Sequence, residues 1–132
     1  MKKSSSVDVV LRFVEYINAQ DVKGLDTLMT EDFTFIDYGG KVECGKDVMR
    51  KGWIGYFTDF PKYKIHVQHV LRGGNGVALI GKTTGSHIPS EVEEKEIVLW
   101  TAEIRDGLVA EWRIYADTDV VKATLKERVE ET

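Results

Sequence analysis

The sequence predicts an α+β fold, in which N-terminal helices pack against one face of a curved, mostly antiparallel sheet. Two observations support this class: apolar residues recur at helical spacing before Pro61, and long segments with alternating side chains follow it. A chain of 132 residues is expected to form one domain, residues 1–132, with room for one core and one cavity. We therefore expect the helices and the sheet to close as a cone around a pocket.

Three helices are expected in the first 60 residues. Apolar side chains recur every three or four positions in residues 6–20, 22–29 and 45–59. Between the last two helices, residues 33–37 have the composition of a strand, and Tyr-Gly-Gly at 38–40 has that of a turn.

Four strands are expected after the helices, followed by a helix at the C-terminal end. Gly73-Gly74-Asn75-Gly76 and Asp106-Gly107 have the composition of hairpin turns, and Asp-Gly favours the positive φ angles of a type I′ turn. The expected strands are residues 63–71, 77–87, 96–105 and 108–117, and the expected helix is residues 119–130.

The Asp106-Gly107 turn raises a question of register. A two-residue turn places Trp100 opposite Arg113, and therefore on a different face from Trp112, because opposite residues share a face. An odd loop, such as a three-residue turn with a Gly bulge, places Trp100 opposite Trp112 or Ile114. We favour the odd loop because it puts both indoles in the core.

Composition and charge exclude several classes of partner. The chain has 18 basic and 22 acidic residues, a net charge of −4, and no concentrated basic stripe of the kind that binds nucleic acid. We find no apolar run long enough to span a membrane. The N-terminal segment is too short and too charged for a signal-peptide core, so we expect a cytoplasmic protein.

Neither a metal nor another cofactor is expected. His66 and His69 are three apart on a predicted strand and therefore point to opposite faces. Cys44 has no second cysteine with which to form a disulfide, and we interpret it as a spectator thiol.

Five short runs occur in an informative order. They are YINAQD at 16–21, EDFTFID at 31–37, FP at 60–61, GSH at 85–87 and DGLVAEW at 106–112. In this order and spacing the chain resembles, over nearly its whole length, the nuclear transport factor 2-like superfamily, and within it the SnoaL-like and ketosteroid-isomerase-like small proteins. The same fold hosts isomerases, cyclases, epoxide hydrolases, dehydratases and non-catalytic binding or assembly modules.

The resemblance implies one candidate base and argues against several chemistries. Asp37 falls where the isomerases carry their catalytic carboxylate. Phe13 takes the position of their helix tyrosine and Trp100 that of their protonated aspartic acid, so ordinary steroid isomerisation is not expected. Ile114 stands where cyclases and epoxide hydrolases carry an aspartate.

The comparison with epoxide hydrolases also places Lys82 and Thr84 on the pocket face beside Asp37. These three residues could bind a ligand, or Lys82 and Asp37 could form a salt bridge at the rim. Alternation along the strand then puts His87 on the opposite face, in a structural or interface role. The expected substrate-binding residues are Phe13, Tyr16, Phe35, Trp53, Tyr56, Phe57, Lys82, Thr84, Trp100, Trp112 and Ile114.

Two hypotheses for function remain open. In the first, the pocket holds an apolar small molecule and Asp37 is the general base of a cofactor-free isomerase, cyclase or dehydratase. In the second, the chain is a non-catalytic ligand-binding or assembly module. In either case we expect a homodimer through the convex sheet face, where Val109, Glu111, Arg113 and Tyr115 should lie.

Overall fold

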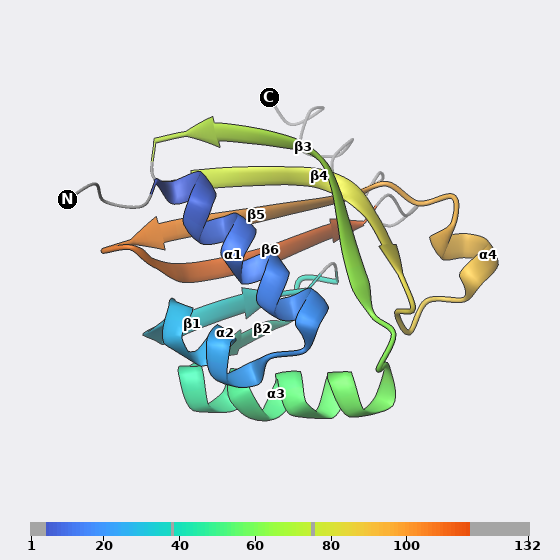
Figure 1. The fold of residues 1–132 in the computed structure, drawn as a ribbon, viewed down its shortest axis with the longest axis horizontal. Coiled ribbons are helices and arrows are strands. Elements are labelled where there is room, and N and C mark those ends of the chain that lie inside the picture. The colour runs from blue at the N-terminus through green and yellow to red at the C-terminus, as the bar shows by residue number, and fades with distance from the viewer. Residues whose placement is uncertain (1–4, 38, 75, 117–132) are drawn as a thin grey trace.

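The computed structural model describes residues 5–37, 39–74 and 76–116 (Figure 1). The helices within these residues are α1 (Ser6–Ala19), α2 (Val22–Leu28), α3 (Lys46–Asp59) and the short α4 (Ser90–Glu93). The strands are β1 (Met29–Ile36), β2 (Val42–Cys44), β3 (Lys64–Gly73), β4 (Gly76–Thr84), β5 (Val98–Arg105) and β6 (Leu108–Ala116). The predicted α+β class is confirmed, and the helix expected at 119–130 lies outside the described residues.

The six strands form one curved sheet in the order β2-β1-β6-β5-β4-β3. Neighbouring strands are antiparallel except β1 and β6, which are parallel, so the sheet is mostly antiparallel, as predicted. It does not close, because β2 and β3 remain as edges. Helix α1 crosses the sheet, and α3 lies along its β1–β2 end (Figure 1).

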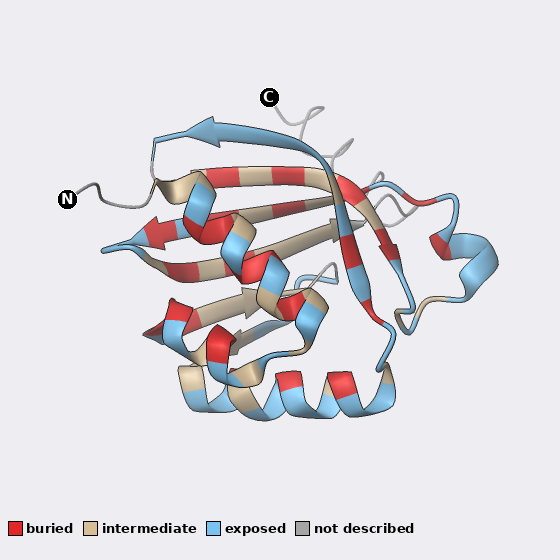
Figure 2. Ribbon diagram, in the orientation of Figure 1, coloured by how far each residue is buried: buried red, intermediate tan, exposed pale blue. Residues whose placement is uncertain are grey.

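Helix α1 is capped at both ends by local interactions. The Ser5 hydroxyl accepts the Asp8 backbone N–H at 3.1 Å, and the Asp8 carboxylate accepts the Ser5 N–H, which forms a capping box. Gln20 ends the helix in the left-handed conformation, with φ 56°. One stripe of the helix is buried (Figure 2), and its members are Val9, Val10, Phe13, Val14 and Ile17.

Phe13 is the centre of the aromatic core. Its ring centroid lies 5.0 Å from that of Trp112, 6.0 Å from that of Phe33 and 6.2 Å from that of Trp53. Tilted and edge-on aromatic pairs at these separations add about 0.5–1.5 kcal/mol each to the effect of burial. The core therefore ties α1 to α3 and to strands β1 and β6.

The turn of the β5–β6 hairpin corrects one expectation. It has two residues, Asp106 with φ 54° and Gly107 with φ 76°, and Arg105 pairs with Leu108 across it. The prediction of an odd loop is therefore wrong. Positive φ at both central residues matches the twist of the flanking strands, which is why Asp-Gly is favoured in such turns.

A β-bulge beside this turn has the same effect on the pairing as the expected odd loop: it shifts β6 by one residue relative to β5. Ile104 pairs with Val109, whereas Glu103 pairs with Glu111, so Ala110 is an extra residue in β6. From that point the pairing is shifted by one position.

The bulge determines which side chains of the hairpin point into the core. Trp100 lies opposite Ile114, as favoured from the sequence, and Trp100 and Trp112 are both in the core. Val109 is also completely buried, so its predicted place on the convex face is wrong. Simple alternation failed there because the extra residue turns Val109 and Ala110 towards the same side.

The face assigned to β4 is also corrected. Thr83 is buried towards the helices, whereas Lys82 and Thr84 lie on the other face. The Lys82 ammonium donates to the Glu94 carbonyl, and the Thr84 hydroxyl is 2.9 Å from His66 Nε2. The alternation of side chains could not show which face of β4 is buried. Val77 and Leu79 on one face and Ala78 and Ile80 on the other are all apolar.

Candidate active site

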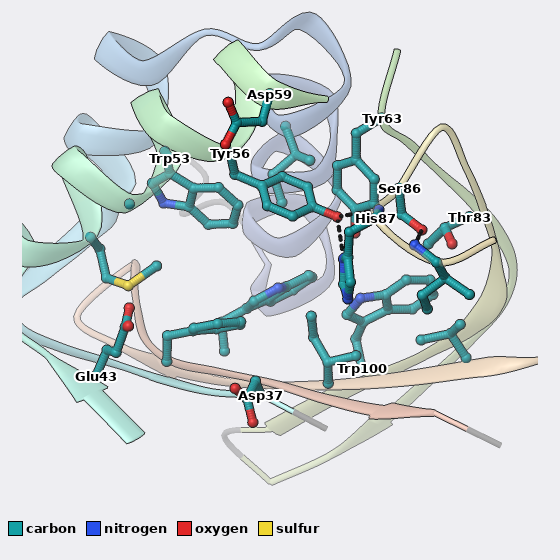
Figure 3. A pocket seen from close by; sticks show the side chains of 18 of the residues that line it. Asp37, Glu43, Trp53, Tyr56, Asp59, Tyr63, Thr83, Ser86, His87 and Trp100 are labelled. Atoms are coloured by element: carbon teal, nitrogen blue, oxygen red, sulfur yellow. Dashed lines mark hydrogen bonds between the residues drawn. The ribbon is translucent and has the colours of Figure 1, made fainter. Parts of the chain in front are cut away.

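A cavity of about 580 Å³ lies between the helices and the concave face of the sheet (Figure 3). Most of its lining is apolar, and helices α1 and α3 and strands β1, β4, β5 and β6 all contribute to it. The lining residues are Ile17, Phe35, Asp37, Gly39, Glu43, Met49, Gly52, Trp53, Tyr56, Asp59, Tyr63, Thr83, Ser86, His87, Ile88, Val98, Trp100, Trp112 and Ile114. A cavity of this size and character suits a small apolar molecule.

Several aromatic rings line the cavity. Phe35 and Trp53 face each other with centroids 6.4 Å apart, and Trp53 stacks on Phe57 at 5.6 Å. Trp100 and Trp112 supply the sheet side and are almost fully buried. The rings fix the shape of the cavity, because well-packed aromatic side chains have few alternative rotamers.

A tyrosine and a histidine form a polar pair at one side of this apolar space. The Tyr56 hydroxyl lies 2.9 Å from His87 Nδ1 and also accepts the His87 backbone N–H at 3.3 Å. The two residues are 31 apart in the chain, and their side chains meet where α3 faces the segment after β4 (Figure 3). The Tyr56 ring packs on Phe60 at 4.8 Å and edge-on to Tyr63 at 5.1 Å, which holds its hydroxyl in place.

The segment that carries His87 is anchored by a buried carboxylate. Glu93, at the end of α4, is 6% exposed and accepts hydrogen bonds from the Thr83 hydroxyl at 2.7 Å and the Ser86 backbone N–H at 3.2 Å. Gly85 starts the segment with φ 71°, and a Cβ at this position would lie 2.4 Å from the Lys62 carbonyl oxygen. The chain therefore makes a sharp, fixed turn that places His87 beside the cavity.

Tyr63 lies behind the polar pair. It is 7% exposed, and burial raises the pKa of its phenol, with the nearby charges of Tyr56 and Glu93 acting in the same direction. The Tyr63 side chain is therefore a neutral phenol near neutral pH.

Asp37 lies at the rim of the cavity, in the turn between β1 and β2. Its Oδ1 accepts the backbone N–H groups of Gly39 and Lys41, both at 2.9 Å. Figure 3 shows the carboxylate directed away from the aromatic rings. This oxygen is thus engaged in stabilising the turn.

The other sequence-predicted binding residues fall into two groups. Phe35, Trp53, Tyr56, Trp100, Trp112 and Ile114 are brought together in the cavity wall. Phe13, Tyr16 and Phe57 pack in or against the core around it, and Lys82 and Thr84 lie on the far face of β4.

Several residues of the wall were not foreseen as such from the sequence. His87, Tyr63, Thr83 and Ser86 all line the cavity. The Gly85-Ser86-His87 run was an available signal, but the strand was expected to continue through it. Because Gly85 ends the regular alternation, the parity of His87 carried no information about its face.

Metal ligands and membrane-spanning helices were looked for among the described residues only. Within residues 5–37, 39–74 and 76–116, no three His, Cys, Asp or Glu side chains are grouped so that they could hold a metal ion. No helix in the described part of the chain is long and apolar enough to cross a membrane.

The SnoaL-like domain model matches residues 10–112, which include most of α1, most of the sheet and most of the cavity wall. The chain belongs to the SnoaL-like family. No match is found among curated protein sequences.

Several solved structures have a similar fold. An NTF2-like protein of unknown function from Cytophaga hutchinsonii is 19% identical, with TM-score 0.71, over 89% of this chain and 95% of that one. IdmH, a candidate polyketide cyclase from Streptomyces antibioticus, is 20% identical, with TM-score 0.70, over 93% and 99%. A candidate ketosteroid isomerase from Kribbella flavida is 14% identical, with TM-score 0.68, over 86% and 78%. These likenesses confirm the nuclear transport factor 2-like fold of this SnoaL-like chain.

Proposed function

We propose that this SnoaL-like protein binds an apolar small molecule in the cavity and moves a proton on it, with His87 as the proton-transferring group. The observation that carries the proposal is the 2.9 Å contact between Tyr56 Oη and His87 Nδ1 at the side of a mostly apolar cavity. Histidine suits this work because its unperturbed pKa lies near neutral pH.

The contact supports one chemically useful form of the imidazole. When Nδ1–H donates to the Tyr56 oxygen, the lone pair of the neutral ring is on Nε2, which accepts the proton. The phenolic oxygen can accept both this N–H and the His87 backbone N–H. Tyr56 is therefore the positioning residue for the base.

The reaction that fits is removal of a proton from carbon next to a carbonyl group. The C–H bond breaks, Nε2 takes the proton, and the electron pair moves onto the carbonyl oxygen to give an enolate. Return of the proton to another carbon completes an isomerisation. Alternatively, the enolate carbon attacks a second carbonyl group of the same molecule: the new C–C bond closes a ring, the π electrons of that carbonyl move onto its oxygen, and the resulting alkoxide takes the proton from Nε2. Structures of candidate enzymes of both kinds share this fold, which supports the reaction class.

Asp37 is the competing base from the sequence comparison. The two backbone N–H groups on its Oδ1 favour a structural role in the turn. Both residues line the cavity, and His87 differs in that its ring nitrogen meets the Tyr56 hydroxyl there.

The test uses 2-tetralone, an apolar ketone with acidic protons next to its carbonyl, in deuterium oxide. Proton NMR measures the loss of those protons with and without protein. We expect acceleration by the native protein, a loss of about 100-fold or more in His87→Gln and a smaller loss in Tyr56→Phe. Asp37→Asn should keep most of the rate; the reverse pattern would assign the base to Asp37 and overturn the role of His87.

The second candidate function is binding without chemistry. It is favoured by the hydrocarbon side chain of Ile114 in the cavity wall and by the engagement of Asp37 in its turn. Under this reading 2-tetralone binds, but its exchange with deuterium proceeds at the buffer rate in every variant.

A further inference from the structure

The outward face of the sheet, away from the helices, carries acidic side chains at one corner and basic side chains at another. At the first corner Glu103 of β5 lies directly opposite Glu111 of β6, and at the second His66 of β3 lies directly opposite Lys82 of β4. Glu103 pairs with Gly76 at the start of β4, whereas Lys82 is near the end of that strand. Residues directly opposite each other share a face, so each corner presents two groups of one kind.

The charges at these corners are not matched by the described part of the chain. Glu103, Glu111 and Lys82 take part in no ion pair among the described residues, and the Lys82 ammonium donates to the Glu94 backbone carbonyl. Carboxylates placed directly opposite each other repel and lower the stability of a sheet. An isolated subunit therefore gains nothing from the acidic corner, which points to a partner that supplies positive charge.

Two arginines on the same face are already engaged elsewhere. Arg105 forms an ion pair with Asp32 of β1. The Arg113 guanidinium lies 4.6 Å from the centre of the Tyr115 ring, which follows it along β6, whereas Glu111 precedes it. The two carboxylates of the acidic corner are thus left for a cation from outside the subunit.

Apolar side chains lie between the two corners. Ile80, Leu99 and Tyr115 are consecutive partners across β4, β5 and β6, and all three are half-buried on the outward face. A surface with an apolar centre, an acidic corner and a basic corner is complementary to a copy of itself. A two-fold axis lying between two such faces brings the acidic corner of each copy onto the basic corner of the other.

We propose that two copies of the chain associate through this face in one orientation, in which Glu103 and Glu111 of each copy contact Lys82 and His66 of the other. Repulsion disfavours an arrangement that brings acidic corner onto acidic corner, so the charges select the orientation while the apolar centre supplies contact area. The association is independent of the chemistry proposed for the cavity, which lies on the opposite face of the sheet.

Reversed charges on separate chains test this pairing. Glu103→Lys and Lys82→Glu each turn attraction into repulsion at both symmetric contacts, so each variant alone should self-associate at least about tenfold more weakly than the native protein. An equal mixture of the two variants has opposite charges at both contacts again. Sedimentation velocity should show that the mixture forms a dimer nearly as stable as the native one.

Lys51→Glu is the matched control, because Lys51 is exposed on α3, away from this face. It makes the same change of charge as Lys82→Glu. It should neither weaken self-association nor restore it when mixed with Glu103→Lys. Circular dichroism checks that each variant keeps the native fold.

The pairing is overturned if the native protein stays monomeric, if the single variants associate as tightly as the native protein, or if their mixture associates no better than its components. Where Lys82→Glu folds poorly, the native protein still decides the matter. Its dissociation constant should rise several-fold between about 0.05 M and about 0.5 M sodium chloride, because salt screens charges at a surface. A dissociation constant that does not respond to salt would also overturn the pairing.

Discussion

Trp100 lies directly opposite Ile114 in the β5–β6 ladder, although a regular ladder from the two-residue turn would place it opposite Arg113. The difference is one residue, the extra Ala110 in the bulge of β6. Because side chains alternate with period two, whether Ala110 bulges out of the ladder or takes a place in it decides whether an indole lines the cavity or faces outward.

Two single-residue deletions test this dependence. Without Ala110 the hairpin becomes a regular ladder that still pairs Trp100 with Ile114, so we expect cooperative folding with a loss of at most about 3 kcal/mol. Without Thr101, Trp100 moves to the outward face, and we expect loss of cooperative unfolding. Urea denaturation followed by tryptophan emission measures both, and equal effects would contradict the register argument.

Gly81 lies at a close backbone approach between β4 and β3. A Cβ at Gly81 would lie 2.0 Å from the His66 carbonyl oxygen, beside the irregular pairing after Val67. We expect Gly81→Ala to lower the free energy of unfolding by at least about 2 kcal/mol, because the backbone must move.

The control is Gly55, which lies in α3 with open space around the position of a Cβ. Gly55→Ala should stabilise the protein by about 0.5–1 kcal/mol, because alanine favours a helix. Urea unfolding of both variants tests the pair. A similar sign for the two substitutions would show that the close approach at Gly81 is easily relieved.

Long periodic segments were predictable from the sequence, and short or irregular ones were not. The apolar stripe of α1 gave its bounds to within one residue, whereas β2 and α4, of three and four residues, are too short to show a period. The parallel pairing of β1 with β6 joins segments more than 70 residues apart, and no local pattern encodes it.

The residues of the cavity wall were predictable where they belong to long periodic helices or strands. Trp53 and Tyr56 follow from helical spacing, and Trp100 and Trp112 follow from the demand that both indoles be buried. His87 could not be placed in this way, because the left-handed Gly85 interrupts the strand. The contact of His87 with Tyr56 depends on packing between elements that are distant in the sequence.

Tyr63 should make stability depend on alkaline pH. Its pKa is raised in the folded state by burial, so near and above pH 10 the unfolded chain has lost a proton that the folded chain retains. Stability contributed by the neutral phenol is thus present below the unfolded pKa of about 10 and is lost as the pH rises beyond it.

The slope for one such group reaches about 1.4 kcal/mol per pH unit. Urea unfolding between about pH 8 and pH 11 should show this fall in the native protein and a shallower one in Tyr63→Phe. Tyr115→Phe, which removes a phenol from the sheet surface, serves as the control. An unchanged slope in Tyr63→Phe would mean that this phenol ionises as readily in the folded chain as in the unfolded one.

The convex face of the sheet is predicted to form a homodimer interface. Ile80, Leu99 and Tyr115 are consecutive partners across β4, β5 and β6, and all three are half-buried on the face away from the helices. The Arg113 guanidinium lies 4.6 Å from the centre of the Tyr115 ring and borders this apolar strip. Continuous apolar side chains across three strands favour contact with a second copy through the same surface.

Light scattering should therefore give a mass of twice the 15.0 kDa chain. Leu99→Glu places a charge at the centre of the strip and should shift the protein towards the monomer, because an unpaired charge is costly to bury. Ile54→Glu, at an exposed position of α3, should leave the mass unchanged. A monomeric native protein, or a Leu99→Glu variant that keeps the doubled mass, would exclude this face as the interface.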